Sequence, residues 1–196
     1  MTAPTLYSEQ DLTANPAPLG LMGFGMTTVL LNLHNLGLFG NSAMILAMGI
    51  FYGGIAQVIA GIMEWKKGNT FGTTAFTSYG FFWLSLVGLL VLPKLGWAEA
   101  ATSGAMGAYL LMWGIFTAFL FIGTLKMDKV SQFIFGSLTV LFLLLAIGDF
   151  SEIASIKWIA GLVGLICGSA AIYAAMALVL NEAYGKTVLS LGGKSH

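Results

Sequence analysis

Six apolar stretches, each long enough to cross a lipid bilayer as a helix, follow one another along this chain. A spanning helix needs ~20 mostly apolar residues. The six stretches cover residues 18–39, 43–63, 73–92, 105–125, 130–148 and 156–180. Because the links between them are short, we expect no soluble domain between the helices. The sequence predicts an all-α polytopic membrane protein, with six transmembrane helices (18–180) around a central pathway and terminal segments at 1–17 and 181–196.

The composition favours a bilayer over water as the solvent of this chain. Only 8% of its 196 residues are charged and 58% are hydrophobic, whereas soluble domains carry about 25% charged residues. A chain of this size leaves too much surface exposed to hide so much apolar area in one core. We therefore expect membrane lipid as a partner, and the formal net charge of zero gives no reason to expect nucleic acid.

The lysines are unevenly shared between the two ends of the predicted spans. The side that carries both termini and the second and fourth links holds six of them, namely Lys66, Lys67, Lys126, Lys129, Lys186 and Lys194. The opposite side holds only Lys94 and Lys157. Because cytoplasmic loops carry an excess of basic residues, both termini are predicted to be cytoplasmic.

The sequence shows no catalytic or metal-binding constellation. It has two histidines, one of them the last residue, and a single cysteine, Cys167, and no Cys/His cluster has the spacing of metal ligands. No nucleophile-elbow or phosphate-loop motif occurs. The carboxylates fall at predicted helix ends, in links or in the N-terminal segment. We therefore expect no enzyme activity, no metal and no cofactor.

Ionisable side chains are missing from the middle of every predicted span. Buried charges in membrane helices usually mark ion or proton pathways, but His34, Glu64 and Glu182 lie nearer the span ends. The chain has no arginine, which excludes a bidentate arginine clamp on a carboxylate. Any anion would be held by hydroxyls, amides and helix N-termini, and such weak binding suits rapid passage better than tight capture.

Polar side chains follow one face of each of the first two predicted helices. Thr28, Asn32 and Asn35 share a helical stripe in the first, and Gln57 lies within the second. Such groups face protein or water rather than lipid. The stripe in the first helix is equally compatible with lining a pathway and with hydrogen bonds between helices; we predict that it and Gln57 line the pathway. In the sixth span, the small residues spaced along 164–175 favour close helix packing.

Residues 15–21, Asn-Pro-Ala-Pro-Leu-Gly-Leu, begin the first predicted helix. Asn15 is a favourable N-cap that can accept a hydrogen bond from the Ala17 N–H, and Pro16 and Pro18 have no N–H to leave unsatisfied. The motif predicts an abrupt helix start at the cytoplasmic interface. The positive end of the helix dipole there is also suited to attract an entering anion.

This motif is similar to the signature of the acetate uptake transporter family, of which the bacterial succinate–acetate permeases (YaaH-like) are the best-known members. The resemblance covers nearly the whole chain and continues through residues 22–28, 31–35, 47–54, 67–72, 76–80, 138–142 and 180–182.

The resemblance implies a homohexamer of six-helix protomers in the plasma (inner) membrane of a bacterium, each with its own acetate pathway. Succinate is a further substrate of the family. By motif position, the hydrophobic constriction looks like Phe24, Tyr79 and Leu138, and Ala171 matches a position linked to substrate size. A largely apolar ring suits a small acid with a methyl group and disfavours hydrated inorganic ions.

The resulting hypothesis is transport of acetate and related small carboxylates, either as an anion channel or as a permease that also moves protons. Two alternatives stay open. The first is a channel for another small solute such as ammonia. The second is a non-transporting subunit of a membrane assembly, in which hydrogen bonds between helices would use up the polar stripe.

Overall fold

The computed structural model describes residues 13–40 and 43–193, and these residues form helices without any β-strand. The helices are α1 (Ala17–Asn35), α2 (Ala43–Ala47), η1 (Met48–Ala56), α3 (Gln57–Lys66), α4 (Thr70–Val91), α5 (Ser103–Thr124), α6 (Lys129–Ser151) and α7 (Ala154–Tyr184). Because α2, η1 and α3 follow one another without a break over Ala43–Lys66, the chain makes six long helical rods.

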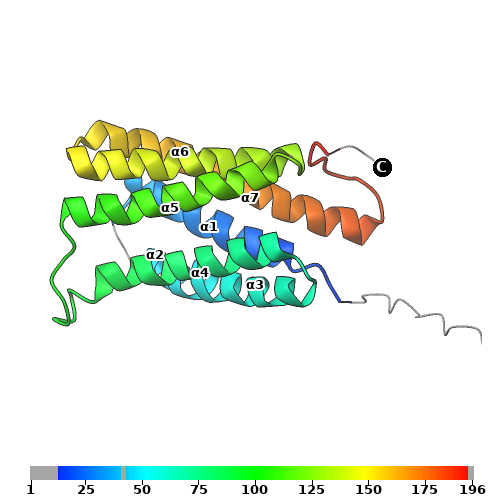
Figure 1. The fold of residues 1–196 in the computed structure, drawn as a ribbon, viewed down its shortest axis with the longest axis horizontal. Coiled ribbons are helices and arrows are strands. Elements are labelled where there is room, and N and C mark those ends of the chain that lie inside the picture. Colours follow the sequence, from blue (N-terminus) through cyan, green and yellow to red (C-terminus); the bar gives the residue numbers. More distant parts are fainter. Residues whose placement is uncertain (1–12, 41–42, 194–196) are drawn as a thin grey trace, which may run out of the picture.

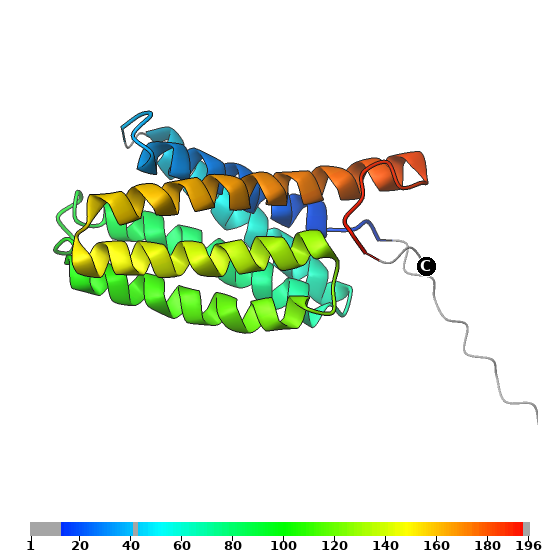
Figure 2. The same ribbon diagram turned by 90° about the horizontal axis from the view of Figure 1, so that it is seen from above.

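The rods run alternately in opposite directions along one common axis (Figures 1 and 2). α1 packs along α7, α7 along α6, and α6 along α5, while α4 lies against η1 and α3. The two ends of the described chain lie at the same end of the bundle, together with the α3–α4 and α5–α6 turns (Figure 1). The lysines of those turns therefore gather at this end, called the terminal end below.

Five of the six rods are long and apolar enough to cross a membrane. They are Ala43–Lys66, α4, α5, α6 and α7. The exception is α1, which has 19 residues and carries Asn32, His34 and Asn35 in its last turn. The sequence predicts six spanning helices, and five of the six rods meet the criteria of length and composition.

Several predicted boundaries were wrong. The first predicted span ran to residue 39, but α1 ends at Asn35, and Gly37 then adopts a positive φ of 83° that breaks the helix. The last predicted span ended at residue 180, whereas α7 continues to Tyr184 and stops at Gly185 in the left-handed region. The predicted domain limits at 17/18 and 180/181 therefore fall inside helices. Glycine ended both helices because it enters positive φ at little cost.

The middle of the second rod is a π-helix, where the sequence predicts an ordinary α-helix. η1 has nine residues, and three of them are the glycines 49, 53 and 54. A Cβ on Gly53 would lie 2.9 Å from the Trp83 ring, and one on Gly54 would lie 2.7 Å from the Leu84 side chain. The glycines therefore let this wider helix press closely onto α4. π-helical turns are rare and occur frequently at functional sites.

Helices α1 and α7 approach each other so closely that backbone lies against backbone. A Cβ on Gly25 would lie 2.8 Å from the Gly168 carbonyl oxygen, and a Cβ on Gly168 would lie 2.8 Å from that of Gly25. A Cβ on Gly164 would meet the Asn32 side chain at 2.2 Å. The packing role predicted for the small residues of the last helix is confirmed at Gly164 and Gly168.

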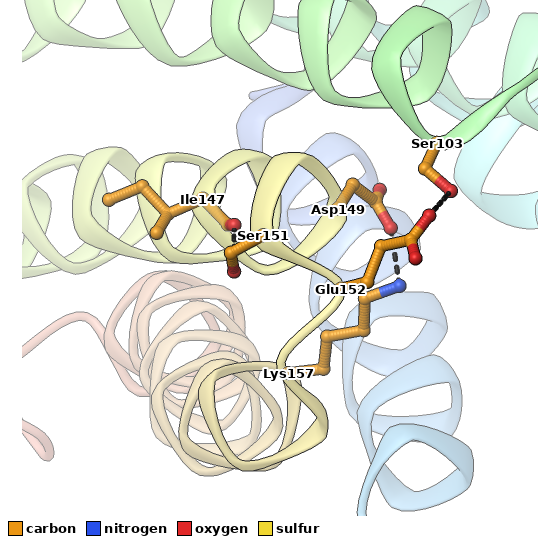
Figure 3. Close-up of polar contacts among 6 residues, drawn as sticks. All are labelled: Ser103, Ile147, Asp149, Ser151, Glu152 and Lys157. Atoms are coloured by element: carbon orange, nitrogen blue, oxygen red, sulfur yellow. Dashed lines mark hydrogen bonds and ion pairs between the residues drawn. The ribbon is translucent and has the colours of Figure 1, made fainter.

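Polar side chains tie three helices together at the end of the bundle opposite the termini (Figure 3). Lys157 of α7 forms an ion pair with Asp149 of α6. The Ser103 hydroxyl, at the start of α5, donates to a Glu152 oxygen at 2.7 Å. Ser151 donates to the Ile147 carbonyl at 2.6 Å. One of the two lysines at this end is therefore neutralised within the protein.

Candidate functional site

A cavity of about 240 Å³ penetrates the bundle from the terminal end. Its mouth is formed by residues at the ends of helices, among them Asn15, Glu64, Asn69 and Asp128. Its deep part is lined by residues from the middle of α1, α4 and α6. The walls between are mostly apolar, with phenylalanines, alanines and leucines. A cavity with an apolar wall and a few polar groups is the usual form of a small-molecule site.

The three residues predicted to form the constriction lie together in the deep part of this cavity. Phe24 comes from α1, Tyr79 from α4 and Leu138 from α6, and all three line the cavity and belong to one buried cluster. The Phe24 and Tyr79 rings lie 6.0 Å apart between centroids and are tilted by 42°. We call these three residues the aromatic–leucine ring. Its role as the narrowest point of a pathway stays a prediction.

Tyr79 is held by α5, a helix that contributes nothing to the cavity wall. Its hydroxyl donates to the Thr117 hydroxyl at 3.0 Å, and Thr117 in turn donates to the Trp113 carbonyl at 2.7 Å. The Trp113 and Phe116 rings pack against Tyr79 with centroids 6.3 and 5.7 Å away. Sequence reasoning missed Thr117. The available signal was a lone hydroxyl in the middle of an apolar span, which needs a partner.

Of the residues predicted to line a pathway, the cavity reaches only Gln57. This side chain is 1% exposed, and its Oε1 has no hydrogen-bond partner among the residues that the structure describes. Ala171 is fully buried in the cluster around the aromatic–leucine ring but is outside the cavity wall. Gln57 therefore brings a buried carboxamide, whose oxygen has no partner among the described residues, into the same cavity wall as that ring.

The polar stripe of α1 lies outside the cavity and bonds mainly within its own helix. Asn32 donates to the Thr28 carbonyl at 2.9 Å, and Asn35 donates to Asn32 Oδ1 at 3.1 Å. The Thr28 hydroxyl is buried and has no partner in the described part of the chain. Hydrogen bonds between helices therefore do not use up this stripe, which was the sign expected of a non-transporting assembly subunit. Its assignment to pathway lining remains a prediction.

The helix-start motif forms part of the cavity mouth. Asn15 Oδ1 accepts from the Ala17 N–H at 3.0 Å, which confirms the predicted hydrogen bond, although Asn15 is not itself the N-cap residue. α1 begins at Ala17, with Pro16 in the capping position and Pro18 in the first turn. Asn15 and Ala17 line the cavity, whereas the two prolines do not. The prolines thus shape the helix start, and the asparagine faces the mouth.

Two carboxylates line the mouth, and both already have donors. Glu64 is 3% exposed, and its Oε2 accepts from Asn69 Nδ2 at 2.7 Å. Asn69 also caps α4 by accepting from the Gly72 N–H at 3.0 Å. Asp128 accepts from the Ser131 N–H and hydroxyl at 2.8 and 2.7 Å. Within the described ranges, no three His, Cys, Asp or Glu side chains are grouped so as to hold a metal ion.

The segment after α7 folds back onto the bundle, although the sequence predicts only a polar tail. Asn181 Oδ1 accepts from the Val188 and Leu189 N–H groups at 2.6 and 3.0 Å, and its Nδ2 donates to the Leu189 carbonyl at 2.8 Å. The Leu191 carbonyl accepts from the Val130 N–H at 3.1 Å, and Leu191 lines the cavity. One asparagine therefore places a C-terminal leucine at the mouth.

Comparison with known proteins places this chain in one family. The model of the GPR1/FUN34/yaaH family matches residues 2–190. The chain is 64% identical over 183 residues to a protein of Escherichia coli (strain K12) named succinate-acetate/proton symporter SatP, covering 93% of this chain and 97% of that protein. A solved structure described as the bacterial acetate channel SatP matches with a TM-score of 0.91 and 64% identity, covering 92% of this chain and 99% of the other.

A more distant relative bears another name. The protein of Saccharomyces cerevisiae called ammonia transport outward protein 2 is 40% identical over 172 residues, covering 84% of this chain and 61% of that protein.

Proposed function

Because this chain belongs to the GPR1/FUN34/yaaH family, we propose that it transports acetate and related small carboxylates such as succinate across the plasma (inner) membrane of a bacterium. The observation that carries the proposal is the aromatic–leucine ring at the deep end of a cavity that opens toward the termini. Such a ring accommodates a methyl group, and it offers no charge to replace the water around an inorganic ion. Transport of this kind needs no enzyme chemistry.

The cavity wall supplies a route to that ring. Asn15 marks the start of α1 at the mouth, where the positive end of the helix dipole favours an approaching carboxylate and opposes its repulsion by Glu64 and Asp128. Gln57 follows, with a buried carboxamide oxygen that has no partner and can take a hydrogen bond from a carboxylic acid. Phe24, Tyr79 and Leu138 then meet the methyl end. No cationic side chain lines the cavity among the residues described, so the substrate is bound weakly and leaves readily.

Uptake of labelled acetate into proteoliposomes tests this function. We expect uptake above that of empty vesicles, with and without a pH gradient, and competition by unlabelled acetate. A gradient that drives accumulation would assign proton-linked transport, whereas mere equilibration would assign a channel. If purified protein raises uptake of neither acetate nor succinate over protein-free vesicles, the proposal is wrong.

Ammonia is a second candidate because one relative is named for ammonia transport and two carboxylates lie at the cavity mouth. Carboxylates attract ammonium and repel acetate. The same vesicles loaded with a pH-sensitive dye separate the two solutes. Ammonium chloride pulses that alkalinise the lumen faster than in empty vesicles, without acetate uptake, would favour ammonia.

We also propose that α1 is the sixth spanning helix, although it is less apolar than the others. Its polar side chains Asn32 and Thr28 are buried against protein rather than turned to lipid, and it packs along α7, a helix of 31 residues. Six spans put both termini on the lysine-rich side, which is cytoplasmic by the distribution of basic residues. A homohexamer, in which each protomer keeps its own cavity, remains part of the proposal.

The topology gives a direct prediction. A reporter that is active only in the cytoplasm, fused after His196, should be active, and one that requires export should be silent. Six spans return the chain to the side from which it began, and the lysine distribution assigns that side. The same reporters fused after Gly96, between α4 and α5, should give the opposite pattern. An exported reporter at the C-terminus contradicts the six-span arrangement.

Proton coupling gives another prediction, since His34, Glu64 and Glu182 are the titratable side chains that the sequence places near the ends of the predicted spans. Each of His34→Gln, Glu64→Gln and Glu182→Gln should keep acetate uptake with nearly the wild-type pH profile. The reason is that the profile follows protonation of the substrate, whose carboxyl group titrates near the usual ~4.3. Initial uptake into vesicles from about pH 5 to about pH 8 measures this.

The same three variants can also contradict the prediction that the pH profile follows protonation of the substrate. Glu64 is buried and bonded to Asn69, and Gln keeps one acceptor for that bond. A variant that still binds acetate but loses its pH dependence would identify a proton-carrying side chain. The protein would then be a symporter with a titrating residue at one mouth.

A further inference from the structure

The hydrogen bonds behind Tyr79 have a direction that their chemistry determines. The Trp113 carbonyl can only accept, so Thr117 must donate its one hydroxyl proton to it, with 2.7 Å between the two oxygens. Thr117 Oγ1 then has only lone pairs left for Tyr79, 3.0 Å away, and Tyr79 must donate. Thr117 is fully buried, so water does not compete for either bond. The single phenolic proton of Tyr79 therefore points to α5.

This direction decides what the aromatic–leucine ring offers to a carboxyl group. Tyr79 lines the cavity, but Thr117 does not, so Tyr79 donates its phenolic proton to a residue outside the cavity wall. Phe24 and Leu138 have no polar side-chain atom. The ring therefore presents no side-chain donor. A carboxylate has only acceptors and meets no donor on the side chains of this ring, so the Gln57 carboxamide elsewhere in the cavity wall is left to satisfy them. The protonated acid is neutral and carries its own donor.

We propose that Thr117 is a positioning residue that selects the protonation state of the substrate: by taking the proton of Tyr79, it keeps the constriction free of hydrogen-bond donors and lets the neutral acid pass in preference to its anion. This inference rests on the proposed transport function and names the form of the substrate that the same site admits. Thr117 need not touch the substrate to do so.

The titratable groups around Tyr79 do not supply the missing donor. The Cys167 thiol on α7 donates a hydrogen bond to the Ile134 carbonyl at 3.5 Å. Tyr109 on α5 donates to the Phe82 carbonyl at 3.0 Å. Glu64 of α3 and Asp128 before α6 line the cavity toward the mouth, and as carboxylates they repel an anion. α1, α4 and α6 add no further charged side chain to the cavity wall.

The test is Thr117→Val, which keeps the branched shape and removes the acceptor. Tyr79 can then turn its proton toward the substrate. Proteoliposomes at equal pH on both sides give initial acetate uptake at about pH 8 and about pH 5, both above the carboxyl pKa of ~4.3. We expect the ratio of uptake at the higher to the lower pH to rise about tenfold, the effect of one donor on a charged group. The ratio is independent of the amount of active protein.

Two controls separate positioning from loss of structure. Thr117→Ser keeps the hydroxyl and should keep the wild-type ratio. Tyr79→Phe added to Thr117→Val removes the released proton and should return the ratio toward wild type. If Thr117→Val is not monodisperse in detergent, Thr117→Ala removes the same acceptor and is expected to raise the ratio too.

Three results would overturn the inference. They are a wild-type ratio in folded Thr117→Val or Thr117→Ala, an equal shift in Thr117→Ser, and a raised ratio that persists in the double variant. Failure of the proposed function is a different result, because the unmodified protein would then show no acetate uptake at either pH.

Discussion

Leu138→Ala should raise the uptake of succinate relative to acetate by about tenfold, the scale on which a few methylene groups discriminate in an apolar pocket. Leu138 is 2% exposed and meets Phe24 and Tyr79 at the deep end of the cavity. Truncation to Ala removes three carbon atoms from the wall at this end of the cavity, and a four-carbon acid gains more from the added space than acetate does. Competition between labelled acetate and unlabelled succinate or lactate in proteoliposomes measures the ratio.

Ala171→Gly provides the graded comparison for this prediction. The sequence pointed to Ala171 as a second size-determining position, and it is fully buried in the same cluster but behind the cavity wall. Loss of one methyl group there should shift the ratio in the same direction by less than Leu138→Ala does. Unchanged ratios in both variants, with normal expression and assembly, would remove both residues from the pathway.

Gly25→Ala should destabilise the protein by about 1–3 kcal/mol, the usual cost of an extra methyl group in a close-packed contact. The added Cβ would lie 2.8 Å from the Gly168 carbonyl oxygen and 2.9 Å from the Ile172 nitrogen. These are backbone atoms, which cannot turn away as a side chain would, so α1 and α7 must move apart. Thermal unfolding in detergent, followed by size-exclusion chromatography, should show a clearly lower midpoint.

Gly88→Ala is the matched control, since Gly88 also lies inside a helix but has no heavy atom of another segment within 4 Å of the position that a Cβ would take. Alanine is a better helix former than glycine by ~1 kcal/mol, so this variant should be as stable as the wild type or more so. Equal midpoints for Gly25→Ala and the wild type would mean that the α1–α7 contact is looser than the structure has it.

The helices and the abrupt start of the first one were predictable because local chemistry determines them. Apolar runs of sufficient length must form helices in lipid, where every backbone group needs an internal partner. The hydrogen bond from the Ala17 N–H to Asn15 follows from the spacing of an acceptor and two prolines and is confirmed. The contact role of Gly164 and Gly168 also followed from small residues on one face.

The resemblance to a family added what local chemistry could not. It named Phe24, Tyr79 and Leu138, which lie on three different helices far apart in sequence and meet in one cavity. No periodicity links residues on different helices, so physical reasoning from the sequence had no route to this trio. The same reasoning placed Thr28, Asn32 and Asn35 in the pathway with Gln57, but only Gln57 reaches the cavity.

By itself, the sequence determined that this chain is a helical membrane protein, with basic residues concentrated on one side and no Asp, Glu, Lys, Arg or His in the middle of its helices, because length, hydropathy and charge are properties of segments. Tertiary structure alone decided which helix ends meet and what each polar group bonds to. Because of the tertiary structure, Asn181 holds the C-terminal segment so that Leu191 lies at the cavity mouth. The second rod forms the π-helix η1 where it packs against α4, and the Tyr79 hydroxyl donates to Thr117. Each of these depends on which atoms of distant segments come within hydrogen-bonding or van der Waals distance, and that distance is set by packing of the whole bundle.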